Sequence, residues 1–113
     1  MKGTNLGEFQ ELVLLTIGTL YPEAYGVGIK DEIKETTGRK VTLSTVHAAL
    51  NRLEKKGLIT SVFGEATKIR GGKRKRYFTI TAHGIKTLQE TRAQRDQLWN
   101  AIPGQVFQVN SLT

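Results

Sequence analysis

The chain has 113 residues, of which 38% are apolar and 12 are glycine, and this composition predicts one globular domain rather than a mainly disordered or fibrous chain. No apolar run approaches the ~18 residues of a membrane span, and residues 1–20 lack the charged-then-apolar order of a signal peptide. We therefore expect a cytoplasmic protein. The sequence contains no cysteine, which excludes a disulfide scaffold and a thiolate metal site.

Basic residues outnumber acidic ones, 17 against 10, which gives a net charge of +7 and a pI near 9.9. A balance this basic favours a polyanionic partner, most often nucleic acid. Six of the cations fall within nine residues, namely Lys68, Arg70, Lys73, Arg74, Lys75 and Arg76. A solvated loop would also explain the run, so the run alone does not decide between loop and binding site.

Apolar residues recur at steps of three or four in the N-terminal half, which predicts three short helices. They cover about residues 6–20, 25–37 and 43–56. Asn5 opens the first of them, with Glu8 in capping-box spacing. Gly38 follows the second as a C-terminal cap, Thr42 caps the start of the third, and Gly57 ends it.

The pattern after the third helix is typical of strands. Residues 58–63 and 76–81 are rich in β-branched and aromatic side chains and predict a β-hairpin, joined by the basic connection 64–75. A fourth helix is expected over about 82–101. The tail, 105–113, is left open between a short docked strand and a frayed end.

Three helices followed by a hairpin, in a mainly α fold, are the arrangement of the winged helix-turn-helix, whose third helix enters the DNA major groove. On a helical wheel one arc of the third helix is apolar, formed by Leu43, Val46, Leu50 and Leu53. The opposite arc carries polar, small or cationic side chains, namely Ser44, Thr45, Ala48, Asn51, Arg52, Lys55 and Lys56. Such groups contact base edges and phosphates, although an isolated amphipathic helix would also present a solvated polar face.

Position along the third helix separates the expected roles. Ser44, Thr45 and Ala48 lie near its N-terminus and are predicted to contact bases. The late cations are predicted to touch the DNA backbone. Glu54, the acid on this helix, lies on the flank of the polar arc, where it would not oppose phosphate directly.

The hairpin tip predicts a phosphate clamp or an arginine in the minor groove. It reads Gly71, Gly72, Lys73, Arg74, Lys75 and Arg76. The two glycines allow close approach of the backbone to DNA, or serve only the turn. Four adjacent like charges repel one another unless a partner neutralises them, which favours binding over a plain loop.

Several of these segments resemble the PadR family of bacterial transcriptional regulators, in the family's order and spacing, over roughly residues 6–88. The segments are Leu12–Leu15, Ala24–Gly26, Leu50–Ile59 and Gly71–Gly84. The resemblance implies a winged-helix repressor that binds a DNA operator as a homodimer, with dimer contacts from the C-terminal helix. The chain looks like the short subfamily, which has a single terminal helix.

Two positions depart from the family pattern, since His47 and Phe78 stand where tyrosines are common. His47 lies at the edge of the buried arc, so packing and phosphate contact remain open for it. By the same resemblance the Tyr25 hydroxyl is a candidate phosphate contact, and packing of its ring is the alternative.

The fourth helix is expected to form a homodimer interface, because a helix this long beside a small core needs another surface. Its apolar stripe is interrupted by a polar middle and consists of Ile85, Leu88, Leu98, Trp99 and Ile102. Trp99 is expected either to be buried between two copies or to stack a small aromatic effector, a class of ligand that the family resemblance implies. The chain then divides into a DNA-binding part, 1–81, a dimerisation helix, 82–102, and a tail, 103–113, of uncertain structure.

The inventory of side chains argues against an enzyme and against a bound cofactor. There is no cysteine nucleophile, and His47 and His83 lack an acid and a nucleophile beside them and do not have metal-ligand spacing. Gly26-Val27-Gly28 follows no strand and is not a nucleotide loop. Two hypotheses remain: a sequence-specific DNA-binding regulator, and a winged-helix module that binds protein or RNA.

Overall fold

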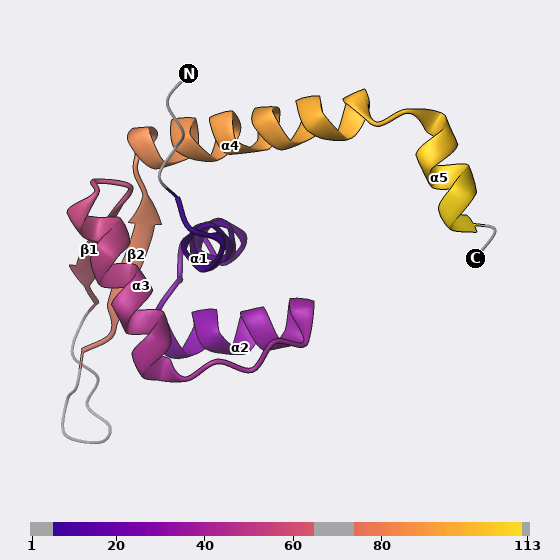
Figure 1. Cartoon of the computed structure of the whole chain (residues 1–113). Helices are drawn as coiled ribbons and strands as arrows, with labels where there is room; N and C mark the ends of the chain where they lie inside the picture. Colours follow the sequence, from indigo (N-terminus) through magenta and orange to yellow (C-terminus); the bar gives the residue numbers. More distant parts are fainter. Residues whose placement is uncertain (1–5, 65–73, 112–113) are drawn as a thin grey trace.

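The computed structural model describes residues 6–64 and 74–111 and has the winged-helix architecture (Figure 1). Three helices are followed by an antiparallel hairpin and two further helices. They are α1 (Glu8–Thr19), α2 (Gly26–Thr37), α3 (Leu43–Lys55), β1 (Ile59–Phe63), β2 (Arg76–Ile80), α4 (Ala82–Ala101) and α5 (Gly104–Ser111). The expected fold class, mainly helical with one small hairpin, is confirmed.

Capping residues at the ends of the helices fix most of these ends where the sequence predicted them. Gly38 and Gly57 both adopt positive φ, 74° and 76°, which glycine tolerates and which ends α2 and turns the chain after α3. The Thr42 hydroxyl accepts a hydrogen bond from the backbone N–H of Thr45 at 3.1 Å and caps α3. The start of α1 differs, because its N-cap is Gly7 without a side-chain cap, and Asn5 lies outside the described residues.

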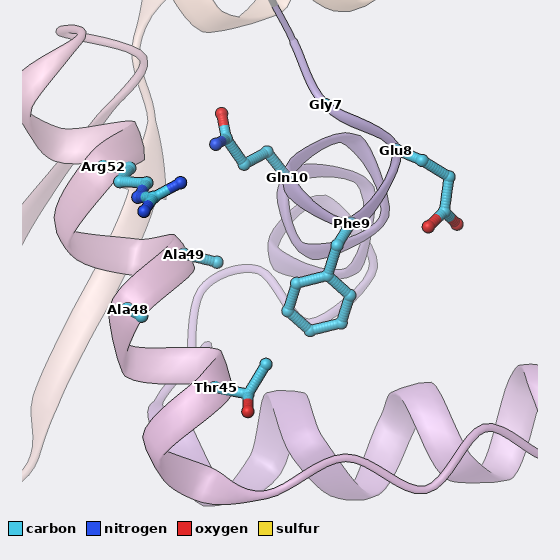
Figure 2. Close-up of a pocket in the computed structure, with 8 residues that line it drawn as sticks. All are labelled: Gly7, Glu8, Phe9, Gln10, Thr45, Ala48, Ala49 and Arg52. Carbon is cyan, nitrogen blue, oxygen red and sulfur yellow. The ribbon is translucent and has the colours of Figure 1, made fainter.

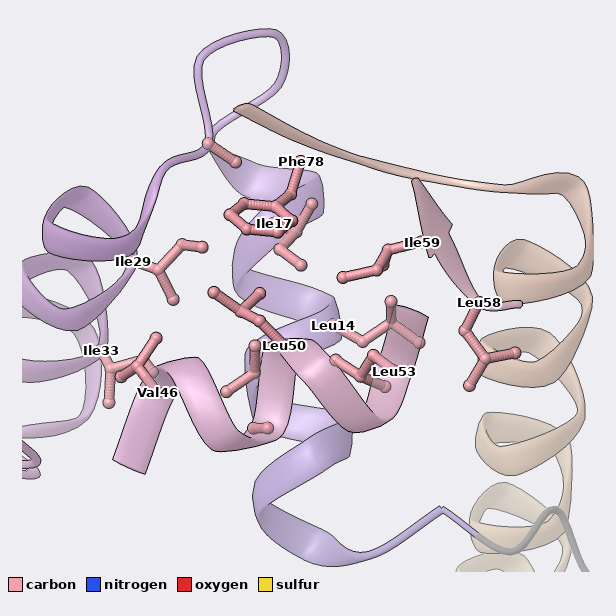
Figure 3. Close-up of a cluster of buried hydrophobic side chains, with 13 residues drawn as sticks. Leu14, Ile17, Ile29, Ile33, Val46, Leu50, Leu53, Leu58, Ile59 and Phe78 are labelled. Carbon is pink, nitrogen blue, oxygen red and sulfur yellow. The ribbon is translucent and has the colours of Figure 1, made fainter. Parts of the chain in front are cut away.

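The core joins all three N-terminal helices to the hairpin (Figure 3). Its buried apolar side chains are Val13, Leu14, Ile17, Ala24, Ile29, Ile33, Val46, Ala49, Leu50, Leu53, Leu58, Ile59 and Phe78. Phe78 of β2 is 1% exposed, and its backbone N–H donates to the carbonyl of Ala24 at 2.8 Å. This contact ties the hairpin to the segment that leads into α2.

The buried face of α3 is rotated slightly from the predicted one. Ala49 is buried, whereas Leu43, predicted on the apolar arc, is 37% exposed. Leu43 is the first residue of α3, so it lies at the end of the helix, where its side chain reaches toward Gly26 instead of the central core. The opposite face of α3 is left to solvent.

The C-terminal part of the chain extends away from the body (Figure 1). α4 buries only small or hydroxylated residues against the body, namely Gly84, Thr87 and Thr91. Of the stripe predicted for α4, Leu88 and Ile102 are half-buried, whereas Ile85, Leu98 and Trp99 are exposed.

The prediction of a strand or a frayed end after Pro103 is wrong for residues 104–111, which form α5, so the terminal helix is not single. Pro103 interrupts the helical path, because it lacks an N–H and follows extended Ile102, and its carbonyl accepts the first bond of the new helix from Val106 at 3.0 Å.

The start of α4 generates a stability prediction. A Cβ at Gly84 would overlap the Leu58 carbonyl oxygen and lie 2.7 Å from Ile80 Cγ2. Gly84→Ala therefore requires the backbone of α4 to move away from that of Leu58. We expect the variant to lower the free energy of unfolding by about 1–3 kcal/mol, measured by urea denaturation. Gly104→Ala is the control, since its Cβ would meet nothing within 4 Å. Equal stability of the two variants would contradict the close approach of α4 to Leu58.

Candidate nucleic-acid interface

The outward face of α3 carries every residue that the sequence selected there. All are exposed, namely Ser44, Thr45, His47, Ala48, Asn51, Arg52 and Lys55. At the N-terminal end the Thr42 hydroxyl lies 3.1 Å from that of Ser44 and 2.7 Å from that of Thr45. These bonds hold three hydroxyls together at the positive end of the helix, a place suited to hydrogen bonding with bases or phosphates.

One flank of this face borders the start of α1 (Figure 2). Thr45, Ala48 and Arg52 line a shallow hollow of about 410 Å³ together with residues 7–10. At the C-terminal end of α3, the Lys56 ammonium donates to the Gln10 side-chain oxygen at 2.7 Å. Arg52 and Lys56 therefore lie beside the start of α1, and the sequence analysis did not foresee Gln10 as a partner of Lys56.

The other flank borders the hairpin through an ion pair. Arg76 Nη2 lies 2.6 Å from Glu54 Oε1, and Arg76 Nε donates to Ser61 Oγ at 3.0 Å. Ser61 Oγ in turn donates to Glu54 Oε2 at 2.9 Å. Glu54 lies on the flank of α3, as predicted. Ser61 was not predicted as a partner of Arg76. The alternation of residues along a strand could have indicated that Arg76 points toward the protein, because Arg76 shares a face of β2 with buried Phe78.

Tyr25 lies between the hairpin and the start of α2. Its ring packs edge-on against Tyr77, with 6.0 Å between centroids, and the Lys75 ammonium lies 4.3 Å from the Tyr25 ring centroid. The ring also packs over Gly28. The half-buried Tyr25 ring thus fills the gap under the base of the hairpin, which is the packing alternative of the sequence analysis.

His47 is exposed, and its ring lies over Gly26 at the first turn of α2. A Cβ at Gly26 would meet the imidazole at 3.0–3.1 Å, so the absence of a side chain there lets the ring lie against the helix. His47 and Tyr25 therefore meet the same turn of α2 from different elements. The imidazole remains at the edge of the outward face of α3.

Besides Arg76, only two of the predicted residues of the hairpin tip lie within the described part of the chain. Arg74 and Lys75 are exposed, and Arg74 Nε donates to the Gly64 carbonyl at 3.0 Å, with its guanidinium 5.5 Å from the Phe63 ring centroid. The other predicted residues of the tip, Lys68, Arg70, Gly71, Gly72 and Lys73, lie outside the described residues. Arg74 and Lys75 thus add exposed positive charge at the base of the tip, as Arg52 and Lys55 do on α3.

Within residues 6–64 and 74–111, no three His, Asp or Glu side chains come together as a metal site would require. None of the described helices is both long and apolar enough to cross a lipid bilayer. What the arrangement offers chemically is hydrogen-bond donors, hydroxyls and positive charge on one surface, which suits a phosphate backbone and base edges.

Comparisons with known proteins agree with this architecture. The model of the transcriptional regulator PadR-like family matches residues 13–90. An uncharacterized protein of Lysinibacillus sphaericus is 35% identical over an 86-residue alignment, and the match covers 74% of this chain and 74% of that protein.

Two solved structures extend the comparison. A PadR family transcriptional regulator of Eggerthella lenta is 27% identical, with a TM-score of 0.64 over 82% of this chain and 80% of that one. A PadR family regulator of Clostridium difficile R20291 has the same fold, with a TM-score of 0.68, 22% identity, and coverage of 83% of this chain and 93% of that one. The chain therefore belongs to the PadR-like family of transcriptional regulators, which are DNA-binding proteins.

Proposed function

We propose that this chain is a homodimeric repressor that binds a specific operator in double-stranded DNA. The observation that carries the proposal is the outward face of α3, which is exposed and polar or cationic along its length, together with the exposed cations Arg74 and Lys75 next to β2. An α-helix of this kind fits the major groove, while the hairpin follows the adjacent backbone. Since its target is DNA, we propose the cytoplasm as its place of action.

Within α3 we propose base contacts for the residues at the centre of the exposed face. Ser44, Ala48 and Asn51 follow one another at three- or four-residue spacing, so they lie on a single line along the helix. The Asn51 amide can bond adenine through two atoms, and the Ala48 methyl can pack on a thymine methyl. Thr45 shares its hydroxyl bond with Thr42 and borders this line.

Phosphate contacts are proposed for the cations around that line. Arg52 and Lys55 lie late in α3, and Arg74 and Lys75 lie at the base of the hairpin tip. The tip residues outside the described part, Lys68 to Lys73, complete the proposed clamp. For Tyr25 the observed ring contacts support packing, and they leave its hydroxyl as a further candidate for a phosphate.

The homodimer is proposed from the apolar surface of the C-terminal arm, defined here as Leu98, Trp99, Ile102, Val106 and Phe107. Leu98 is 71% and Trp99 63% exposed, and the Trp99 and Phe107 ring centroids are 5.3 Å apart. Apolar residues gathered in this way on an arm outside the body favour burial against another protein surface. A second copy supplies that surface by symmetry and places two α3 helices on one DNA duplex.

Repression and an aromatic effector are carried over from the family resemblance. Exposed Trp99 beside Phe107 is the surface on which we expect a planar ligand to stack, in competition with the dimer contact. The division of the chain into a DNA-binding part, 1–81, and a dimerisation helix, 82–102, is part of this proposal.

Specific binding is tested by fluorescence anisotropy with duplexes tiled from the DNA upstream of the gene. We expect one tile to bind about 10³-fold or more tightly than a scrambled duplex. Asn51→Ala is expected to cost about 1–3 kcal/mol on that tile and to leave the scrambled duplex unchanged. Equal binding of all duplexes would contradict the proposal and favour the alternative, a basic module that binds protein or RNA.

The phosphate contact of Lys75 is tested by the salt dependence of the same titration. Lys75→Gln is expected to weaken all duplexes alike and to reduce the slope of log K against log salt by about 0.9. Lys86→Gln on α4 is the matched control, because it removes an exposed charge from an element on the far side of α1 from α2 (Figure 1). If the slope of log K against log salt is the same in Lys75→Gln and Lys86→Gln, Lys75 does not contact a phosphate.

The dimer is tested by sedimentation equilibrium. The unaltered protein is expected at twice the chain mass of 12.6 kDa, and Leu98→Asp at or near the chain mass, because a carboxylate would be buried unpaired in the interface. Val27→Asp, at a 45% exposed apolar residue of α2, is expected to keep the mass of the unaltered protein. A Leu98→Asp protein that also keeps that mass would place the interface elsewhere.

A further inference from the structure

Glu54 is the single acid in α3, the helix proposed to enter the groove of a polyanion. It lies in the last turns of α3, beside the hairpin, and its carboxylate bonds Arg76 and Ser61 on two different strands. Three elements, α3, β1 and β2, therefore meet at one group of side chains. We call Glu54, Ser61 and Arg76 the hinge triad.

The Arg76 guanidinium is already occupied within the chain. Nη2 and Nε are bonded to Glu54 and Ser61, and the Phe78 and Phe63 ring centroids lie 5.1 Å and 6.0 Å from its Cζ. Arg76 is a half-buried residue, while the neighbouring Arg74 and Lys75 are exposed. A guanidinium held by a carboxylate, a hydroxyl and two rings has little freedom to reach a phosphate.

The position of the hinge triad along the hairpin explains how it can affect the orientation of the hairpin relative to α3. Arg76 is paired with Phe63 in the last rung of the ladder before the tip, and the opposite end of the hairpin joins α3 through the Gly57 turn. The turn sets where β1 begins, and Phe78, buried in the core and bonded to Ala24, holds the middle of β2. The hinge triad adds an attachment to α3 at the tip end of the ladder.

We infer that the hinge triad sets the angle to α3 of the tip end of the hairpin, so that Glu54 and Arg76 position Arg74 and Lys75 on DNA and Arg76 is not itself a phosphate contact. The inference rests on the proposed function, since the angle matters only when α3 and the hairpin bind one duplex together. It assigns the acid of α3 a favourable role. A plain electrostatic view predicts the reverse, because an acid near DNA repels phosphate.

The two views predict opposite signs for Glu54→Gln. In the positioning view, loss of the ion pair frees the hairpin, and the variant binds the operator about tenfold more weakly with an unchanged salt slope. In the electrostatic view, removal of a negative charge tightens binding to every duplex. Glu90→Gln, at an exposed acid of α4, is the matched control for the change in net charge.

Arg76→Gln is the second arm of the anisotropy experiment. We expect an operator affinity similar to that of Glu54→Gln, a smaller ratio of operator to scrambled binding, and a salt slope equal to that of the unaltered protein. The double variant should lose no more than either single variant, because both remove the same attachment. A slope reduced by about 0.9 in Arg76→Gln, or tighter binding by Glu54→Gln, would overturn the inference.

Hydrogen exchange of the free protein separates failure of this inference from failure of the proposed function. Amides of 59–63 and 76–80 are expected to exchange faster in both single variants, while those of α1 are unchanged. Unchanged exchange in the hairpin would overturn the hinge triad whatever the DNA result. Faster exchange together with no duplex bound above the scramble would keep the attachment but overturn the proposed function, and with it the role of the triad on DNA.

Discussion

The burial of one face of α3 is the constraint on which the rest of the structure depends. Val46, Leu50 and Leu53 are each at most 1% exposed, packed with α1 and the hairpin. A helix repeats every 3.6 residues, so fixing this face also fixes which side chains point outward. The line of Ser44, Ala48 and Asn51 is exposed because the opposite line is in the core. The packing that stabilises the fold therefore also determines which residues of α3 are exposed to contact DNA in the proposed function.

The sequence predicted those parts of the fold that depend on neighbouring residues. The caps at Thr42, Gly38 and Gly57 lie where expected, because a hydroxyl or a positive φ acts within a few residues. The errors lie at the ends of helices, where tertiary position decides. Leu43 has the apolar side chain of a core residue, but it is the first residue of α3, about one turn before Val46, where the buried face begins. The tail offered no clear period, and α5 was missed.

Pairing between distant elements was the part of the candidate site that the sequence could not supply. The six clustered cations look equivalent as a string, yet Arg76 is bonded to Glu54, 22 residues away, while Lys75 lies on the Tyr25 ring. The difference arises where the chain enters β2, whose alternation turns Arg76 to the same side as Phe78. Lys56 and Gln10, 46 residues apart, are a second pair of this kind. Charge counts therefore predict a basic surface but not which cations are available to a ligand.

The polar middle of α4 has a physical reason that the wheel alone did not reveal. Thr87 and Thr91 face the body, and their hydroxyls donate to the carbonyls of His83 and Thr87 at 2.9 Å and 2.8 Å, so they are buried without an unpaired donor. Short side chains at these positions, with Gly84, let α4 approach the body closely. Leu98 and Trp99 come later in α4, beyond the body, and remain exposed within the described part of the chain. One helix thereby supplies a docking face to its own chain and, in the proposed dimer, an apolar face to the second copy.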